Sequence, residues 1–127
     1  MSSKKLVLED LEKTITRLEE AVKLKKTDIV RDSAIKRFEL CFDLAWKNIQ
    51  IYARKEGMDC HSPRGCIKTA FQLNLIDYDD RWLEMLEDRN LTVHMYKENI
   101  AEKVYGRLPS YIFLLKGLIQ KLSQLNP

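Results

Sequence analysis

A histidine lies close to an arginine and a tyrosine in the last third of the chain. Arg89, His94 and Tyr96 all fall within residues 87–96, and the sequence has one other histidine, His61. A histidine near neutral pH can move a proton, and an arginine can stabilise the charge that develops on a phosphate. These residue types fit metal-independent cleavage of RNA, whose 2′-hydroxyl is an internal nucleophile. A surface arginine near a histidine bonded to a helix-end carbonyl would give the same pattern, so this alternative stays open.

The spacing of the three residues sets a condition on the backbone. Around an uninterrupted helix, about 140° would separate Arg89 from His94 and about 200° would separate His94 from Tyr96. The side chains would then not share a face. They can reach one cleft if the helix breaks at Thr92-Val93, or if a second subunit completes the site.

The cysteines offer a weaker candidate. Cys60-His61 followed by Cys66 matches no zinc spacing and lacks a fourth ligand, so we expect no metal and no other cofactor. The total of three cysteines is odd, which argues against a disulfide framework. We therefore expect a loop thiol and a packed thiol. Because the chain also opens without an apolar signal core, we expect a cytoplasmic protein.

Helices must position these residues. Apolar side chains recur at steps of three and four, which is typical of amphipathic helices, and no segment alternates like a strand. The predicted helices cover about residues 8–22, 28–55, 63–73 and 98–122, and a further one starts after residue 77 or 79 and ends near residues 90–94. The aromatic side chains expected in the core are Phe38, Phe42, Trp46, Phe71 and Trp82.

Several helix ends are marked by capping residues. Gly57 should end the second helix, and Ser62 should cap the short third helix with Pro63 at its first position. Asp77 or Asp79 should cap the fourth helix. The apolar side of that helix is expected to consist of Trp82, Leu83, Met85 and Leu86.

Length and composition limit the architecture. The chain has 127 residues, of which 45% are hydrophobic and 32% charged, so we expect one packed domain over residues 1–127. The predicted fold is all-α, an up-and-down bundle of four main helices plus one short helix. The 22 basic and 19 acidic residues give a net charge of only +3, and no apolar run is long enough for a membrane span. The wide apolar stripes predict a dimer.

Three motifs together resemble those of the nucleotidyltransferase substrate-binding proteins, a HepT-like branch of the HEPN superfamily. In this sequence they read RFELCFDLAWK at 37–47, SPR at 62–64 and DRNLTVHMY at 88–96. The resemblance covers nearly the whole chain, in order. It departs at Asn74, where the family is expected to prefer glycine, and this departure concerns a turn and not catalysis.

The resemblance implies a HEPN-like homodimer that acts as a ribonuclease toxin on RNA. Arg89 would stabilise the phosphate, His94 would be the general acid or base, and Asn90 would be the polar residue that commonly follows the arginine. The implied antitoxin is a cognate minimal nucleotidyltransferase that silences the toxin by transferring AMP to Tyr96.

The same resemblance permits a second function. The family was first interpreted as a noncatalytic substrate-binding subunit of a two-component nucleotidyltransferase, in which the bundle holds the nucleotide acceptor. The two hypotheses differ in whether the protein alone cuts RNA.

Overall fold

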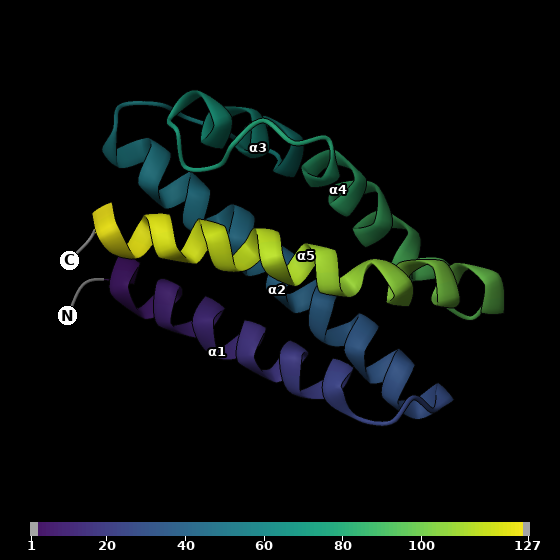
Figure 1. The fold of residues 1–127 in the computed structure, drawn as a ribbon. Helices are drawn as coiled ribbons and strands as arrows, with labels where there is room; N and C mark the ends of the chain where they lie inside the picture. Colours follow the sequence, from purple (N-terminus) through teal and green to yellow (C-terminus); the bar gives the residue numbers. More distant parts are fainter. Residues whose placement is uncertain (1–2, 126–127) are drawn as a thin grey trace.

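Three long helices form the frame of the molecule, and two shorter ones cover part of it. The long helices are α1 (Ser3–Lys23), α2 (Asp28–Lys55) and α5 (Glu98–Leu125), and the shorter ones are α3 (Pro63–Gln72) and α4 (Arg81–Leu91). The computed structural model describes residues 3–125, with side chains from residue 7 onward. In Figure 1, α1 lies on one side of α2 and α5, whereas α3 and α4 lie on the other.

The predicted all-α bundle is confirmed. The part of the chain that the structure describes contains no strand, and it has five α-helices, of which α4 is nearly as short as α3 and not one of four long elements as predicted. None of these helices combines the length and the apolar character that a membrane crossing requires.

The second helix has the bounds that the sequence predicts. At its start, the backbone N–H of Val30 donates to the hydroxyl of Thr27 at 3.1 Å, which satisfies one of the free donors of the first turn. At its end, Gly57 takes a left-handed conformation with φ of +81°, which a glycine adopts without steric cost.

One hydrophobic core runs through the bundle. It includes Phe38 of α2 and Tyr111 of α5, whose stacked rings lie 5.4 Å apart. Two predicted core residues are wrong: Phe71 is 45% exposed and packs edge-on against Tyr78, and Leu83 is 36% exposed. Both lie on the outer faces of short helices, where a single layer of packing leaves part of each apolar stripe in solvent.

The helix caps and turns around α3 and α4 agree only in part with those predicted from the sequence. Ser62 caps α3 as predicted, because its hydroxyl accepts a hydrogen bond from the Gly65 N–H at 3.1 Å. Asn74 has φ of +60°, the left-handed conformation that asparagine tolerates better than most residues. The predicted caps of α4 are wrong, since its N-cap is Asp80 and the Asp79 carboxylate instead accepts from the Arg81 N–H.

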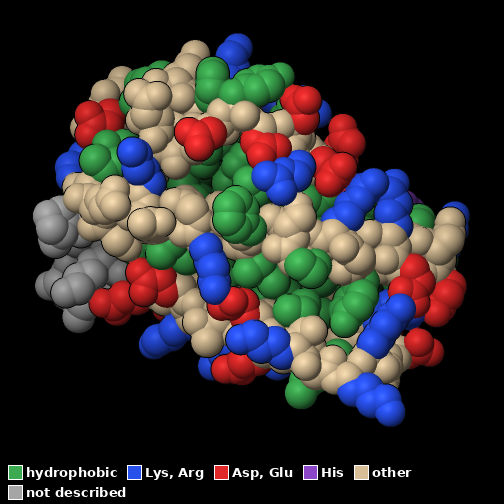
Figure 2. Space-filling model, in the orientation of Figure 1, with side chains coloured by type: hydrophobic (Ala, Val, Ile, Leu, Met, Phe, Trp, Pro, Cys, Tyr) green, Lys and Arg blue, Asp and Glu red, His purple; other side chains and the backbone are tan. Residues whose placement is uncertain are grey.

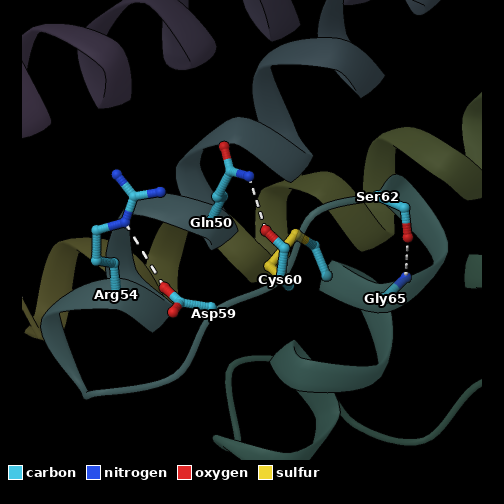
Figure 3. Close-up of a disulfide and its surroundings, with 7 residues drawn as sticks. Gln50, Arg54, Asp59, Cys60, Ser62 and Gly65 are labelled. Atoms are coloured by element: carbon cyan, nitrogen blue, oxygen red, sulfur yellow. Dashed lines mark hydrogen bonds and ion pairs between the residues drawn. A yellow bond between two sulfur atoms is a disulfide. The ribbon is translucent and has the colours of Figure 1, made fainter.

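The expectation of free thiols in the loop and α3 is also wrong. Cys60 and Cys66 form a disulfide across the start of α3, with their Cα atoms 5.1 Å apart, and only Cys41 is free, buried in α2. The loop before α3 curls back so that Cys60 reaches the first turn of the helix (Figure 3). The odd cysteine count is explained by one bonded pair and one core thiol, so it argues neither against a disulfide nor for a compartment.

Candidate functional site

The helix carrying Arg89 breaks where the sequence predicts. α4 ends at Leu91, and a 3₁₀ turn, η1 (Thr92–His94), replaces the next helical turn. Thr92 is buried, and its hydroxyl donates to the Arg89 carbonyl at 2.7 Å, which occupies an acceptor at the helix end. The chain then turns and α5 begins, so His94 is presented on a short exposed connection.

Arg89 points from the last turn of α4 toward α2. Its Nε and Nη2 donate to the two carboxylate oxygens of Asp43 at 3.1 and 3.2 Å, which is a two-point ion pair. Its Nη1 lies 3.5 Å from the Thr92 hydroxyl and 4.0 Å from Glu39. Hydrogen bonding to Asp43 raises the pKa of Arg89, and the guanidinium stays charged in a fixed orientation.

Sequence reasoning missed Asp43 as a member of the site. The residue lies 46 positions before Arg89, so no local pattern joins the two. The signal that could have found it is its spacing from Glu39. Carboxylates four residues apart lie on one helix face, so both can lie close to the same cation. The structure confirms this arrangement, with both carboxylates turned to the same guanidinium.

His94 and Tyr96 form a second pair at the exposed turn. The Tyr96 hydroxyl lies 3.4 Å from His94 Nδ1, and the rings are 6.0 Å apart in an edge-on arrangement. Tyr96 is 75% exposed, and the histidine is exposed as well. The structure therefore joins His94 to Tyr96, and Arg89 to Asp43, through separate contacts within one chain.

A pocket of about 360 Å³ adjoins Arg89. Asn90, the predicted supporting residue, is exposed at its rim. The side chains that line this pocket come from α2, α3 and α4, and they are Phe42, Asp43, Trp46, Lys47, Pro63, Leu86, Arg89 and Asn90. We call it the Arg89 pocket.

A buried polar cluster fixes the last turns of α4 against α5. Asp88 is only 1% exposed, and both its oxygens lie 3.1 Å from Arg107 Nη1. Tyr111 also donates to it, and burial together with these carboxylate contacts raises the pKa of the Tyr111 hydroxyl. Since Asp88 precedes Arg89, the cluster holds the backbone from which the arginine projects toward α2.

A second ion cluster fixes the other side of the exposed turn. Arg31 of α2 is 3% exposed and lies 2.6 Å from Glu98, the first residue of α5, and 3.4 Å from Glu102. The hydrogen bond with Glu98 raises the pKa of the guanidinium, although burial acts in the opposite direction. The turn that carries His94 is therefore held between two ion clusters, each with one buried charged residue, Asp88 in the first and Arg31 in the second.

The described residues hold no group of three or more histidine, cysteine, aspartate or glutamate side chains placed to bind a metal ion. Cys60 and Cys66 are bonded to each other, which removes them as thiolate ligands.

Comparison with known proteins shows the family. Residues 6–124 match the family model described as "Nucleotidyltransferase substrate binding protein like". The chain belongs to this nucleotidyltransferase substrate-binding family. A curated relative from Haemophilus influenzae, named "Probable ribonuclease HepT", is 23% identical over 107 residues, which cover 77% of this chain and 73% of the relative.

Two solved structures share the fold of this chain. One, from Thermus thermophilus, is 38% identical, covers 88% of this family member and 98% of its own chain, and superposes with a TM-score of 0.82. The other, from Haemophilus influenzae, is 18% identical, with coverage of 94% and 96% and a TM-score of 0.72. That second structure is described as the fold of a substrate-binding domain of a nucleotidyltransferase, and its likeness to this chain shows the shared fold.

Proposed function

We propose that this protein is a metal-independent ribonuclease, the toxin of a pair whose antitoxin is a minimal nucleotidyltransferase. The observation that carries the proposal is the placement of two side chains at one helix end. Arg89 is held by Asp43 on the last turn of α4, and His94 is exposed on the 3₁₀ turn that follows.

Each residue has a role that its surroundings support. His94 takes the proton of the RNA 2′-hydroxyl or returns a proton to the leaving 5′-oxygen. Arg89 stabilises the charge on the phosphate through Nη1, since its Nε and Nη2 are occupied by Asp43. Asn90, exposed beside Arg89, supports the phosphate or sugar as a neutral hydrogen-bonding group.

A homodimer would complete this site. Within one chain the contacts of Arg89 and His94 are separate, whereas two facing copies would offer two arginines and two histidines to one RNA strand. Leu40 on α2 and Val93 on η1 are 51% and 68% exposed, so the elements that carry the site also carry apolar surface for such a contact.

The proposed regulation acts at Tyr96. Its exposed hydroxyl is accessible to a partner enzyme, and its contact with His94 Nδ1 places any added group beside the histidine. AMP on this oxygen would block His94 sterically and bring a phosphate that competes with RNA for Arg89.

A second candidate is a noncatalytic subunit that binds the substrate of a nucleotidyltransferase. The family description favours it, and the Arg89 pocket offers a place for a small group. In that case RNA or another acceptor would bind without being cut.

An RNA cleavage assay of the purified protein with EDTA present separates the two candidates. We expect cleavage by the wild type, and a loss of about 100-fold or more in His94→Ala and in Arg89→Ala, the usual range for a general acid or base and for a charge-stabilising donor. His61→Ala is the matched control, because His61 is also an exposed histidine and lies in the loop before α3. Equal cleavage by the wild type and His94→Ala would contradict the ribonuclease proposal.

A further inference from the structure

The Arg89 pocket has the walls and the polar groups of a nucleobase site. We infer that it binds one unpaired base of the RNA strand, stacked on Trp46, while the adjoining phosphate meets Arg89. The inference rests on the proposed ribonuclease function and extends it to the form of the substrate, which is single-stranded RNA with a base turned out of the stack.

Part of the pocket lining is apolar, and the indole ring of Trp46 is its most exposed apolar group on α2. Trp46 is half-buried and packs against the core, with Phe42 and Leu86 beside it on α2 and α4. Pro63 of α3 also lines the pocket. The volume of about 360 Å³ lies at the low end of the range for small-ligand pockets, about 300–1,000 Å³. Stacking on an aromatic side chain is the general way in which proteins hold a single unpaired base.

The rim supplies what a nucleotide requires beyond stacking. Asn90 has an amide with donors and an acceptor, which can meet the edge of a base. Lys47 lies exposed on the α2 side, and Arg89 lies on the α4 side, so two cations stand where the backbone of the strand would pass. Asp43 is the one acidic lining residue, and its charge is engaged by Arg89.

The α3 wall is fixed before any ligand arrives. Figure 3 shows the disulfide of Cys60 together with the hydrogen bond from Gln50 to the Cys60 carbonyl, 2.7 Å long, and the Ser62 cap. These bonds tie the loop before Pro63 to α2 and to α3. A preformed site loses less entropy on binding than a flexible one.

A second groove with aromatic side chains, also formed by described residues, fits this role less well. It lies between α3 and α4, has a volume of about 280 Å³, and contains Phe71 and Tyr78. Its lining has three aspartates, Asp77, Asp79 and Asp80, against two cations, Arg64 and Lys68, so its acidic groups outnumber its basic ones. Arg89 is absent from this lining, whereas it lines the Arg89 pocket, where cations outnumber the one carboxylate.

The fluorescence of Trp46 tests the inference directly. A Trp82→Phe protein retains Trp46 as its single tryptophan, and Trp82 is 3% exposed and outside the pocket lining. The probes are a short 2′-O-methyl oligoribonucleotide, which lacks the nucleophile for cleavage, and an abasic strand with the same phosphates. We expect the first to quench Trp46 and the second to bind about tenfold more weakly without quenching. Equal binding of the two strands, or binding without quenching, would overturn the inference.

Substitutions in the pocket give a second measurement. Trp46→Leu should weaken binding of a labelled 2′-O-methyl strand by about tenfold or more, whereas Trp46→Phe should retain most of the affinity because it keeps a stacking ring. Trp82→Phe is the control for the loss of a tryptophan. Unchanged affinity in a folded Trp46→Leu protein would overturn the inference. If Trp46→Leu does not fold, the quenching experiment decides alone.

These experiments distinguish failure of the base-site inference from failure of the proposed ribonuclease function. If a base quenches Trp46 but the protein never cuts RNA, the ribonuclease proposal is contradicted and the base site is supported. If cleavage depends on His94 but Trp46→Leu retains full activity, the ribonuclease proposal is supported and the base site is contradicted.

Discussion

At the scale of single residues, the arginine of the site is held and the histidine is free. The Arg89 side chain is one-quarter exposed and bonded at two points to Asp43, whereas the imidazole of His94 is exposed and contacts the exposed ring of Tyr96. A fixed cation suits charge stabilisation, because it does not have to reorganise as the charge develops. An exposed imidazole is accessible to the oxygens of a phosphodiester between which a proton has to move.

Modification of Tyr96 is testable on its own. We expect co-expression with the cognate nucleotidyltransferase and ATP to raise the intact mass by whole AMP units and to abolish RNA cleavage. Tyr96→Phe lacks the acceptor oxygen, so it should keep much of the ribonuclease activity and show no mass shift. Intact mass spectrometry and the cleavage assay measure the two effects.

Tyr78→Phe provides the matched control. Tyr78 is 74% exposed, against 75% for Tyr96, and lies outside the turn that carries His94. It should be modified and silenced like the wild type. A Tyr96→Phe protein that still gains AMP and loses activity would place the acceptor at another residue.

Some residues of the site could be predicted from the sequence, and one could not. Arg89, His94 and Tyr96 stand within eight positions of one another, and their chemistry could be considered from types alone. Asp43 could not be assigned, because its role depends on α2 and α4 packing together over a separation of 46 residues. The roles of the three local residues remain predictions, since contacts alone do not establish them.

At the scale of elements, capping and periodicity predicted most helices, and tertiary packing decided the rest. The bounds of α2 and the Ser62 cap followed from local chemistry. The start of α4 did not, because three neighbouring aspartates offered competing caps and the side chain of Asp79 is occupied by Arg81. The disulfide could not be predicted either, since it requires the loop after α2 to fold back on α3.

Loss of the disulfide should lower the free energy of unfolding of the bundle. The bond joins residues six positions apart, and closing so short a loop stabilises the folded state by about 2 kcal/mol in the chain-entropy model. Urea denaturation with and without dithiothreitol should show this difference in the free energy of unfolding.

Cys60→Ala/Cys66→Ala serves as the control for the reductant. Its stability should not respond to dithiothreitol, although it includes an added cost for the cavity left at the fully buried Cys66. Equal stability of the oxidised and reduced wild type would contradict the prediction.

At the scale of the whole molecule, charge is spread instead of concentrated. Figure 2 shows basic and acidic side chains interspersed over the visible face, with apolar groups between them. A net charge of +3 supplies little general attraction for RNA. Affinity for a strand must therefore come from a local arrangement, which is the part that we assign to Arg89, Lys47 and the stacking surface of Trp46.

The proposed dimer belongs to this scale. The apolar side chains left in solvent on the site-bearing elements predict association, so sedimentation at micromolar concentration should give twice the mass of the chain. Leu40→Glu would place a charge in the proposed contact and should shift the protein toward the monomer. Lys121→Glu is a charge-changing control near the end of α5, outside the elements that carry the site. A wild-type monomer at these concentrations would exclude a site shared by two subunits.

The beginning of α1 and the end of α5 lie together at one end of the bundle, and the turn that carries His94 lies at the other (Figure 1). α5 alone, with 28 residues, spans about 42 Å between these ends. A dye, an affinity handle or a surface tether attached near the start of α1 or the end of α5 would therefore sit about one helix length from the turn. Immobilised protein can present the turn that carries His94 to solution, and a donor dye at the opposite end would test by energy transfer whether a labelled strand arrives there.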